Sequence, residues 1–233
     1  MIPLRDRNPA HARPYVTWAL ALANVLVFLY MASLGDVFEL TGFVFDYGFV
    51  PALFRDRPLD ALPSLFTSLF LHGSWAHLLS NMVFLVVFGD NVEDRFGRFR
   101  YLVFYLLGGA FATLTHMLFA GDSSVPLVGA SGAISAVLGA YIALFPRQQV
   151  LTFVPPLFVP WLLLSFLAPV PRFFMFWLPA WVFIGYWALI QVFEAGASLG
   201  VPVTDGGVAW WAHVGGFAFG LAWTNLLGPW RRR

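Results

Sequence analysis

Long apolar stretches separated by short polar ones follow one another along this 233-residue chain. The first runs from about residue 15 to about 34, close to the roughly 20 residues that a helix needs to cross a bilayer. It is longer than the apolar core of a secretory signal peptide, so we expect a retained helix. Further apolar segments follow at about 73–90, 101–119, 127–145, 174–194 and 208–228. The pattern predicts an all-α membrane protein, a bundle of six transmembrane helices.

An additional apolar segment, at about 149–171, is interrupted by five prolines. Proline breaks the hydrogen-bond ladder of a helix, and a broken ladder facing lipid is costly. We therefore expect a re-entrant or interfacial excursion on the cytoplasmic side, with a kinked hairpin of two half-spans as the alternative. The expected membrane domain covers 15–228, between a cytoplasmic segment at 1–14 and a basic tail at 229–233. Its long outer connection, about 35–70, is expected to lie along the membrane surface.

Composition supports membrane residence and excludes several classes of function. Hydrophobic residues make up 60% of the chain and charged residues only 11%, about half the charged fraction of soluble domains. The net charge of +1 comes without a basic patch, so we expect no nucleic-acid partner. The absence of cysteine excludes a disulfide framework, a thiolate metal site and a cysteine nucleophile.

The basic residues, all of them arginines, predict the orientation. They gather before the first span, between the second and third spans, at both ends of the proline-rich segment and at residues 231–233; only Arg55 and Arg57 lie elsewhere. The positive-inside rule then places both termini in the cytoplasm, which requires an even number of crossings. We expect a multi-pass protein of the inner, or cell, membrane.

Polar side chains within three of the spans point to chemistry, because such groups are expensive in lipid unless they serve a function. His77 and Asn81 share one helix face of the second span, since they are four residues apart. Ser131 opens the fourth span and His213 opens the sixth. These three spans all run inward from the outer side, so the four side chains are expected at one depth near the outer surface.

A serine and a histidine at one depth suggest nucleophilic catalysis, since a histidine can take the proton that makes serine reactive. Spans four and six contain no acid, so the residues support a Ser131–His213 dyad whose imidazole is oriented by packing. His77, Asn81 and the backbone N–H of Ser131 are the expected donors to an oxyanion.

Two further expectations concern the surroundings of the dyad. His72 and Ser74, nearer the outer surface, are expected to line the path of water. Small residues, among them Gly132, Gly216 and Gly220, are expected to let the fourth and sixth spans approach closely.

Each of these residues also has an ordinary interpretation when taken alone. A single histidine in a membrane helix is more often buried and hydrogen-bonded than catalytic, and His77 with Asn81 can join helices. His72 and His77 are badly spaced for a metal on one helix face and have no carboxylate beside them, so no metal is expected. His116 has no evident partner. A transporter would need polar groups through the whole depth of the membrane, whereas the inner halves of these spans are apolar.

Three motifs together resemble those of the rhomboid family. Residues 67–82, with His72, His77 and Asn81, are similar to its second-helix signature. Gly129-Ala-Ser131-Gly132 resembles its nucleophile motif, and Ala212-His213-Val-Gly-Gly216 with Gly220 resembles its base motif.

The resemblance implies a six-helix core and a serine endopeptidase without a cofactor. It implies Ser131 as nucleophile and His213 as base and acid, with His77 and Asn81 helping the Ser131 amide, beside Gly129, to hold the oxyanion. The implied partners are membrane lipid and single-span membrane-protein substrates, cut near the outer boundary; the oligomeric state is not indicated. Some relatives stack an aromatic on the histidine from the position occupied here by Ser135. An inactive rhomboid-like binding or quality-control factor is the alternative.

Overall fold

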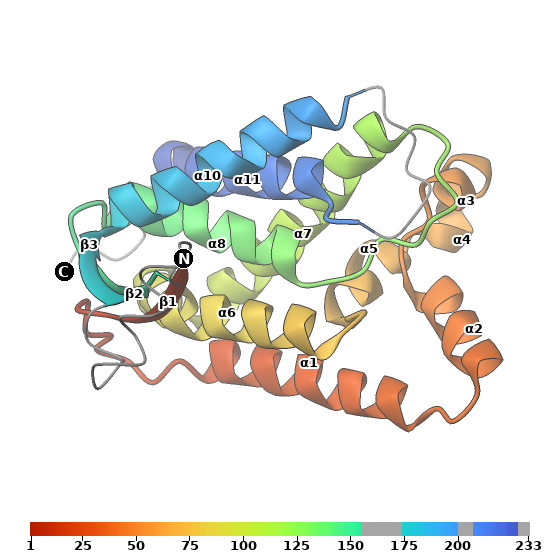
Figure 1. Ribbon diagram of the computed structural model, residues 1–233, viewed down its shortest axis with the longest axis horizontal. Coiled ribbons are helices and arrows are strands. Elements are labelled where there is room, and N and C mark those ends of the chain that lie inside the picture. Colours follow the sequence, from red (N-terminus) through yellow and green to blue (C-terminus); the bar gives the residue numbers. More distant parts are fainter. Residues whose placement is uncertain (155–173, 200–206, 228–233) are drawn as a thin grey trace, which may run out of the picture.

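A bundle of six lengthwise helices makes up most of the computed structural model, which describes residues 1–154, 174–199 and 207–227 (Figure 1). The six are α1 (Tyr15–Ser33), α6 (Trp75–Phe96), α7 (Arg98–Ala120), α8 (Ser131–Leu144), α10 (Ala180–Ala197) and α11 (Trp210–Leu227). Within the described ranges, α1, α6, α7 and α10 are each long and apolar enough to cross a membrane, and α8 is a shorter apolar helix of 14 residues. The predicted all-α membrane bundle is confirmed.

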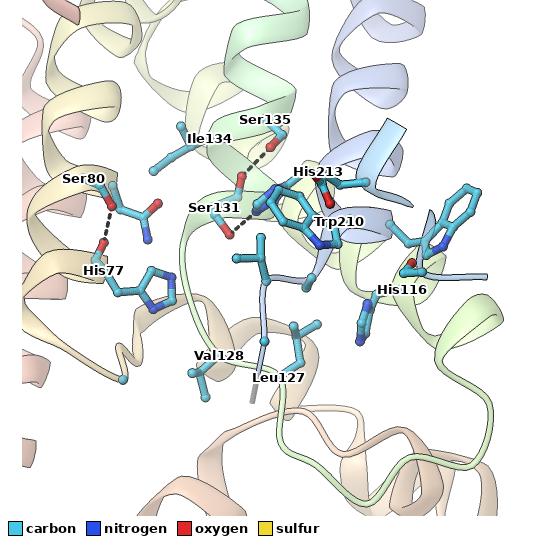
Figure 2. Close-up of a pocket in the computed structure, with 18 of the residues that line it drawn as sticks. His77, Ser80, His116, Leu127, Val128, Ser131, Ile134, Ser135, Trp210 and His213 are labelled. Carbon is cyan, nitrogen blue, oxygen red and sulfur yellow. Dashed lines mark hydrogen bonds between the residues drawn. The ribbon is translucent and has the colours of Figure 1, made fainter. Parts of the chain in front are cut away.

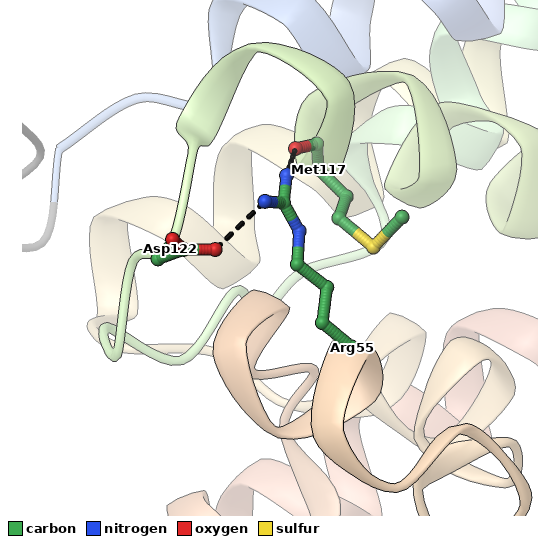
Figure 3. A network of polar contacts seen from close by, with 3 residues as sticks. All are labelled: Arg55, Met117 and Asp122. Carbon is green, nitrogen blue, oxygen red and sulfur yellow. Dashed lines mark hydrogen bonds and ion pairs between the residues drawn. The ribbon is translucent and has the colours of Figure 1, made fainter.

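The connection between α1 and α6 gathers at one end of the bundle, at the right of Figure 1. It contains α2 (Val37–Tyr47), α3 (Pro51–Asp56), α4 (Pro58–Ala61), α5 (Ser64–Thr67) and the 3-10 turn η1 (Ser68–Phe70). On α3, the guanidinium of Arg55 donates to the carboxylate of Asp122 at 2.7 Å and to the carbonyl of Met117 at 3.3 Å (Figure 3). These contacts tie the connection to the end of α7.

A small antiparallel sheet at the opposite end of the bundle was not anticipated. Its strands are β1 (Ile2–Asp6), β2 (Gln149–Phe153) and β3 (Met175–Pro179), in the order β1-β2-β3. The 1–14 segment therefore contributes a strand. The apolar stretch expected as a helix from 174 begins as β3, and its helix starts only at Ala180, after the extended Pro179. The prolines of the 149–171 segment fall within 155–173, outside the described residues, so neither expectation for that segment is tested.

The start of α1 is held by one acidic side chain of another helix. Pro14 precedes α1 and supplies no side-chain cap, which leaves the first N–H groups of the helix without partners inside it. The carboxylate of Glu93, on α6, accepts from the backbone N–H groups of Val16 and Thr17 and from the hydroxyl of Thr17, at 2.8–3.1 Å. Glu93 is 2% exposed. The N-terminal cap of α1 is thus made by tertiary structure.

The closest helix packing is between α8 and α11. A Cβ added at Gly216 would overlap the carbonyl oxygen of Gly132, and one at Gly220 would lie 2.8 Å from the carbonyl carbon of Ala136. Any side chain at these glycines would therefore push the two backbones apart. This contact brings the first turns of α8 and α11 together.

Candidate active site

The first turns of α8 and α11 carry the two residues from which the sequence predicted a dyad. Ser131 is the first residue of α8, and His213 lies in the first turn of α11. Nε2 of His213 lies 2.8 Å from Oγ of Ser131, a hydrogen-bond distance (Figure 2). Both side chains are partly buried, and they come from segments 82 residues apart in the chain.

Both residues line a cavity of about 1130 Å³. His77 and Asn81, from α6, line the same cavity. Figure 2 shows His77 on the yellow ribbon of α6, across the cavity from Ser131. The structure therefore brings all four polar side chains singled out from the spans into one space.

The backbone around Ser131 presents amide donors to this cavity. No side chain caps the N-terminus of α8, so its first N–H groups have neither an intrahelical partner nor a capping oxygen. The N-terminal end of a helix also carries partial positive charge, which favours a developing anion. The backbone N–H of Ser131 is therefore suited to receive an oxyanion.

Gly129 does not add a free donor, because its N–H already donates to the carbonyl of Ser68 at 2.9 Å. It has a φ of +126°, and a Cβ there would lie 2.7 Å from the ring of His77. Glycine is the residue that accepts this conformation, and its missing side chain leaves room for the imidazole. Gly129 thus makes space for the ring of His77, while its expected place beside the oxyanion stays a prediction.

Asn81 is held by the histidine that was expected along the water path. Nδ2 of Asn81 lies 2.9 Å from Nε2 of His72, and the two side chains are 6% and 1% exposed. An amide nitrogen can only donate, so Nε2 of His72 is the acceptor. Burial, with a smaller effect from His77, lowers the pKa of His72 to about 4, which keeps it a neutral acceptor at pH 7. His72 thus holds the side chain of Asn81 and does not itself line the cavity that contains Ser131 and His213.

Ser74, the other residue expected along the water path, is exposed at the edge of the cavity. Its hydroxyl oxygen accepts from the backbone N–H of His77 at 3.1 Å and so caps α6. Serine is a preferred residue at this position because its oxygen satisfies a donor of the first turn. Ser74 therefore helps to fix the helix start that carries His77.

The other ring nitrogen of His213 has a partner that was not predicted from the sequence. Nδ1 of His213 lies 2.6 Å from Oε1 of Gln191, which is on α10 and 6% exposed. A signal was present, because Gln191 is a polar residue within the mostly apolar 174–194 segment, and a polar residue in a span is a functional candidate. The rings of Trp187 and Trp210 lie 6.0 and 6.2 Å from the imidazole. Packing alone therefore does not orient His213.

Two further cavity residues have limited roles. Ser135 donates from its hydroxyl to the carbonyl of Ser131 at 2.6 Å and is 1% exposed, so it does not cover the imidazole. His116, for which the sequence indicated no partner, lines the cavity from α7. In the part of the chain that the structure describes, its Nδ1 has no hydrogen-bond partner.

Comparison with known proteins identifies the family of this chain. The family model of the rhomboid domain matches residues 60–230. RHOMBOID-like protein 12, mitochondrial, of Arabidopsis thaliana is 26% identical over 230 residues, covering 91% of this chain and 58% of that protein. Rhomboid-like protein 11, chloroplastic, of the same plant is 33% identical over 112 residues, 48% of this chain and 39% of that protein. Rhomboid protease GluP of Bacillus subtilis (strain 168) is 39% identical over 89 residues, covering 37% of this chain and 17% of that protein. The chain thus spans less than two thirds of the length of these relatives.

Proposed function

Because this chain belongs to the rhomboid family, we propose that it is a serine-type intramembrane endopeptidase, which hydrolyses peptide bonds in or near the transmembrane segments of other membrane proteins. The observation that carries the proposal is the 2.8 Å separation between Nε2 of His213 and Oγ of Ser131. Substrates are single-span membrane proteins that reach the cavity from the lipid.

The reaction proceeds in two halves. Oγ of Ser131 attacks the scissile carbonyl carbon while Nε2 of His213 takes the hydroxyl proton. The resulting imidazolium returns that proton to the nitrogen of the leaving amine, the C–N bond breaks, and an acyl-enzyme ester remains on Ser131. A water molecule then gives a proton to Nε2 and attacks the ester, and the proton returns to Oγ as the acid product leaves.

Charge on the carbonyl oxygen is stabilised by donors on two sides. The backbone N–H of Ser131, at the start of α8, faces it from one side, and Nδ2 of Asn81 with the ring of His77 faces it from the other. One hydrogen of the Asn81 amide binds His72 at 2.9 Å, which leaves the second for the substrate. Losing one such donor typically costs about 10²–10³ in rate, so Asn81→Ala retains more activity than Ser131→Ala.

Labelling with a fluorophosphonate tests the proposal directly. The wild-type protein in detergent is expected to become labelled and to cleave a generic transmembrane substrate, and Ser131→Ala is expected to do neither. Ser198→Ala is a matched control, because Ser198 also lines the cavity while its hydroxyl donates to the carbonyl of Ala195 at 2.8 Å. Cleavage by Ser131→Ala at the wild-type rate refutes the serine mechanism. A wild-type protein that is neither labelled nor active favours the inactive binding factor.

The orientation in an inner, or cell, membrane follows from the arginines. The proposal places the end of the bundle with the small sheet, and both termini, in the cytoplasm. Because the chain has no cysteine, single cysteines can report accessibility. Asp60→Cys, at an exposed site in the outer connection, should react with an impermeant maleimide on intact cells, and Arg147→Cys, exposed at the other end, only after permeabilisation. The reverse pattern refutes this orientation.

A further inference from the structure

We infer that Gln191 is a positioning residue for the catalytic histidine, which makes the site a Ser131–His213–Gln191 chain of hydrogen bonds drawn from three helices. The inference rests on the proposed function and extends it. Its starting point is the contact of 2.6 Å between Nδ1 of His213 and Oε1 of Gln191, beside the 2.8 Å contact between Nε2 and Ser131.

The orientation of the Gln191 amide is decided by its second contact. Nε2 of Gln191 donates to the backbone carbonyl of Trp187, one turn earlier on α10, at 3.3 Å. A carbonyl oxygen only accepts, so the NH₂ group must face Trp187 and the amide oxygen must face the imidazole. Nδ1 of His213 must then carry the hydrogen of this bond.

This arrangement selects the tautomer that the reaction needs. With its hydrogen on Nδ1, a neutral imidazole presents the lone pair of Nε2 to the hydroxyl of Ser131. The opposite tautomer would point a hydrogen at Ser131 and could not take its proton. When Nε2 accepts that proton, the Nδ1–H bond to Gln191 becomes a charge-assisted bond and strengthens. Gln191 exchanges no proton in this step.

Gln191 thus does without charge what an aspartate does in a serine–histidine–aspartate triad. The ring centroids of Trp187 and Trp210 lie 6.0 and 6.2 Å from that of the imidazole, and these indole rings offer no acceptor. Ser135 occupies the position one turn after the nucleophile and is bonded to the backbone of Ser131. The role of orienting the base therefore falls to a side chain on α10. Because the dyad lies on α8 and α11, a displacement of α10 would withdraw the acceptor and weaken the base.

Two substitutions separate a positioning role from a purely structural one. Gln191→Leu removes the acceptor at similar size, and Gln191→Glu keeps an acceptor oxygen toward Nδ1. We expect Gln191→Leu to lower kcat about 10- to 100-fold, the size expected for one hydrogen bond to a charged group, with KM changed less than about threefold. We expect Gln191→Glu to recover most of that loss. The acidic limb of its kcat/KM profile should lie at higher pH than in the wild type, because a carboxylate stabilises the protonated imidazole.

Asn24→Leu is the matched control, because Asn24 is also a buried amide that donates to the carbonyl four residues earlier, at 2.8 Å, but lies on α1 away from the cavity. It should leave kcat and the pH profile as in the wild type. A wild-type kcat in Gln191→Leu overturns the inference. An unshifted acidic limb in the kcat/KM profile of Gln191→Glu also overturns it, and this result can be obtained even if the leucine variant does not fold. Ser131→Ala is assayed in parallel. If Ser131→Ala is active, the proposed function has failed. If Ser131→Ala is inactive and Gln191→Leu is fully active, only the positioning role of Gln191 is refuted.

Discussion

Replacing Gly216 by alanine tests whether the contact between α8 and α11 sets the dyad geometry. An added Cβ would overlap the carbonyl oxygen of Gly132 and lie 3.1 Å from its carbonyl carbon and from Cβ of Ser135. Ordinary contacts between carbon atoms lie at about 3.5–4.0 Å. The obstructing atoms of Gly132 are backbone, so no rotamer change relieves the overlap, and the helices must separate by on the order of 1 Å.

A separation of this size acts directly on catalysis, because Gly216 is one turn from His213 and Gly132 is next to Ser131. The 2.8 Å bond of the dyad would lengthen beyond hydrogen-bond range. A misplacement of about 1 Å in an active site can reduce the rate about 10²-fold, and overpacking a helix contact costs about 1–3 kcal/mol of stability. We therefore expect Gly216→Ala to lose about 10²-fold in kcat/KM for a transmembrane substrate and to have a lower thermal midpoint in detergent.

Gly185→Ala is the control for this experiment. Gly185 lies in the interior of α10, and a Cβ there meets nothing within 4 Å. Alanine at this position should leave activity unchanged and raise stability by about 0.5–1 kcal/mol, because glycine is unfavourable within a helix. The reasoning is refuted if Gly216→Ala cleaves substrate at the wild-type rate, or if Gly185→Ala loses as much activity as Gly216→Ala.

Three further predictions concern stability. Glu93→Leu leaves three donors of Val16 and Thr17 without an acceptor, so the free energy of unfolding should fall by on the order of 3 kcal/mol. Glu93→Gln keeps an acceptor oxygen and should lose less stability. Equal thermal midpoints for the two variants would contradict the capping role. The pKa of His72 is lowered from 6.5 to about 4 in the folded protein, so the unfolded state binds more protons between these two pH values. The free energy of unfolding should therefore fall by up to about 3 kcal/mol as the pH drops from about 6.5 to about 4. His72→Gln should lack this pH dependence. If its thermal midpoint fell with pH over this range as steeply as that of the wild type, His72 would not be the group responsible. Arg55→Ala should lower the free energy of unfolding by less than about 1 kcal/mol, since the side chains of the Arg55–Asp122 ion pair are 42% and 81% exposed. A loss of several kcal/mol would show that the outer connection depends on this ion pair.

The apolar pattern was sufficient to predict the bundle, because each membrane helix must satisfy its own backbone and must be long enough to cross the hydrocarbon. The family follows from the motifs around His77, Ser131 and His213, and the match over residues 60–230 confirms it. The pattern was less informative where apolar residues are not helical. The 175–179 stretch belongs to a segment that was expected as a span, yet it pairs with β2 as a strand. Periodicity alone does not separate a short strand from the first turns of a helix.

The sequence by itself predicted which segments are apolar enough to enter a membrane and at which end of their segments His77, Ser131 and His213 lie, since both depend only on hydropathy and on local spacing. Only the tertiary structure decided which side chains meet. The acceptor for His213 comes from Gln191, 22 residues away on another helix, and the cap of α1 comes from Glu93, 76 residues after Thr17. Such contacts depend on how each helix is rotated and how closely it packs against its neighbours. That is decided by glycine contacts such as Gly216 against Gly132, where close packing of two backbones leaves no room for a side chain.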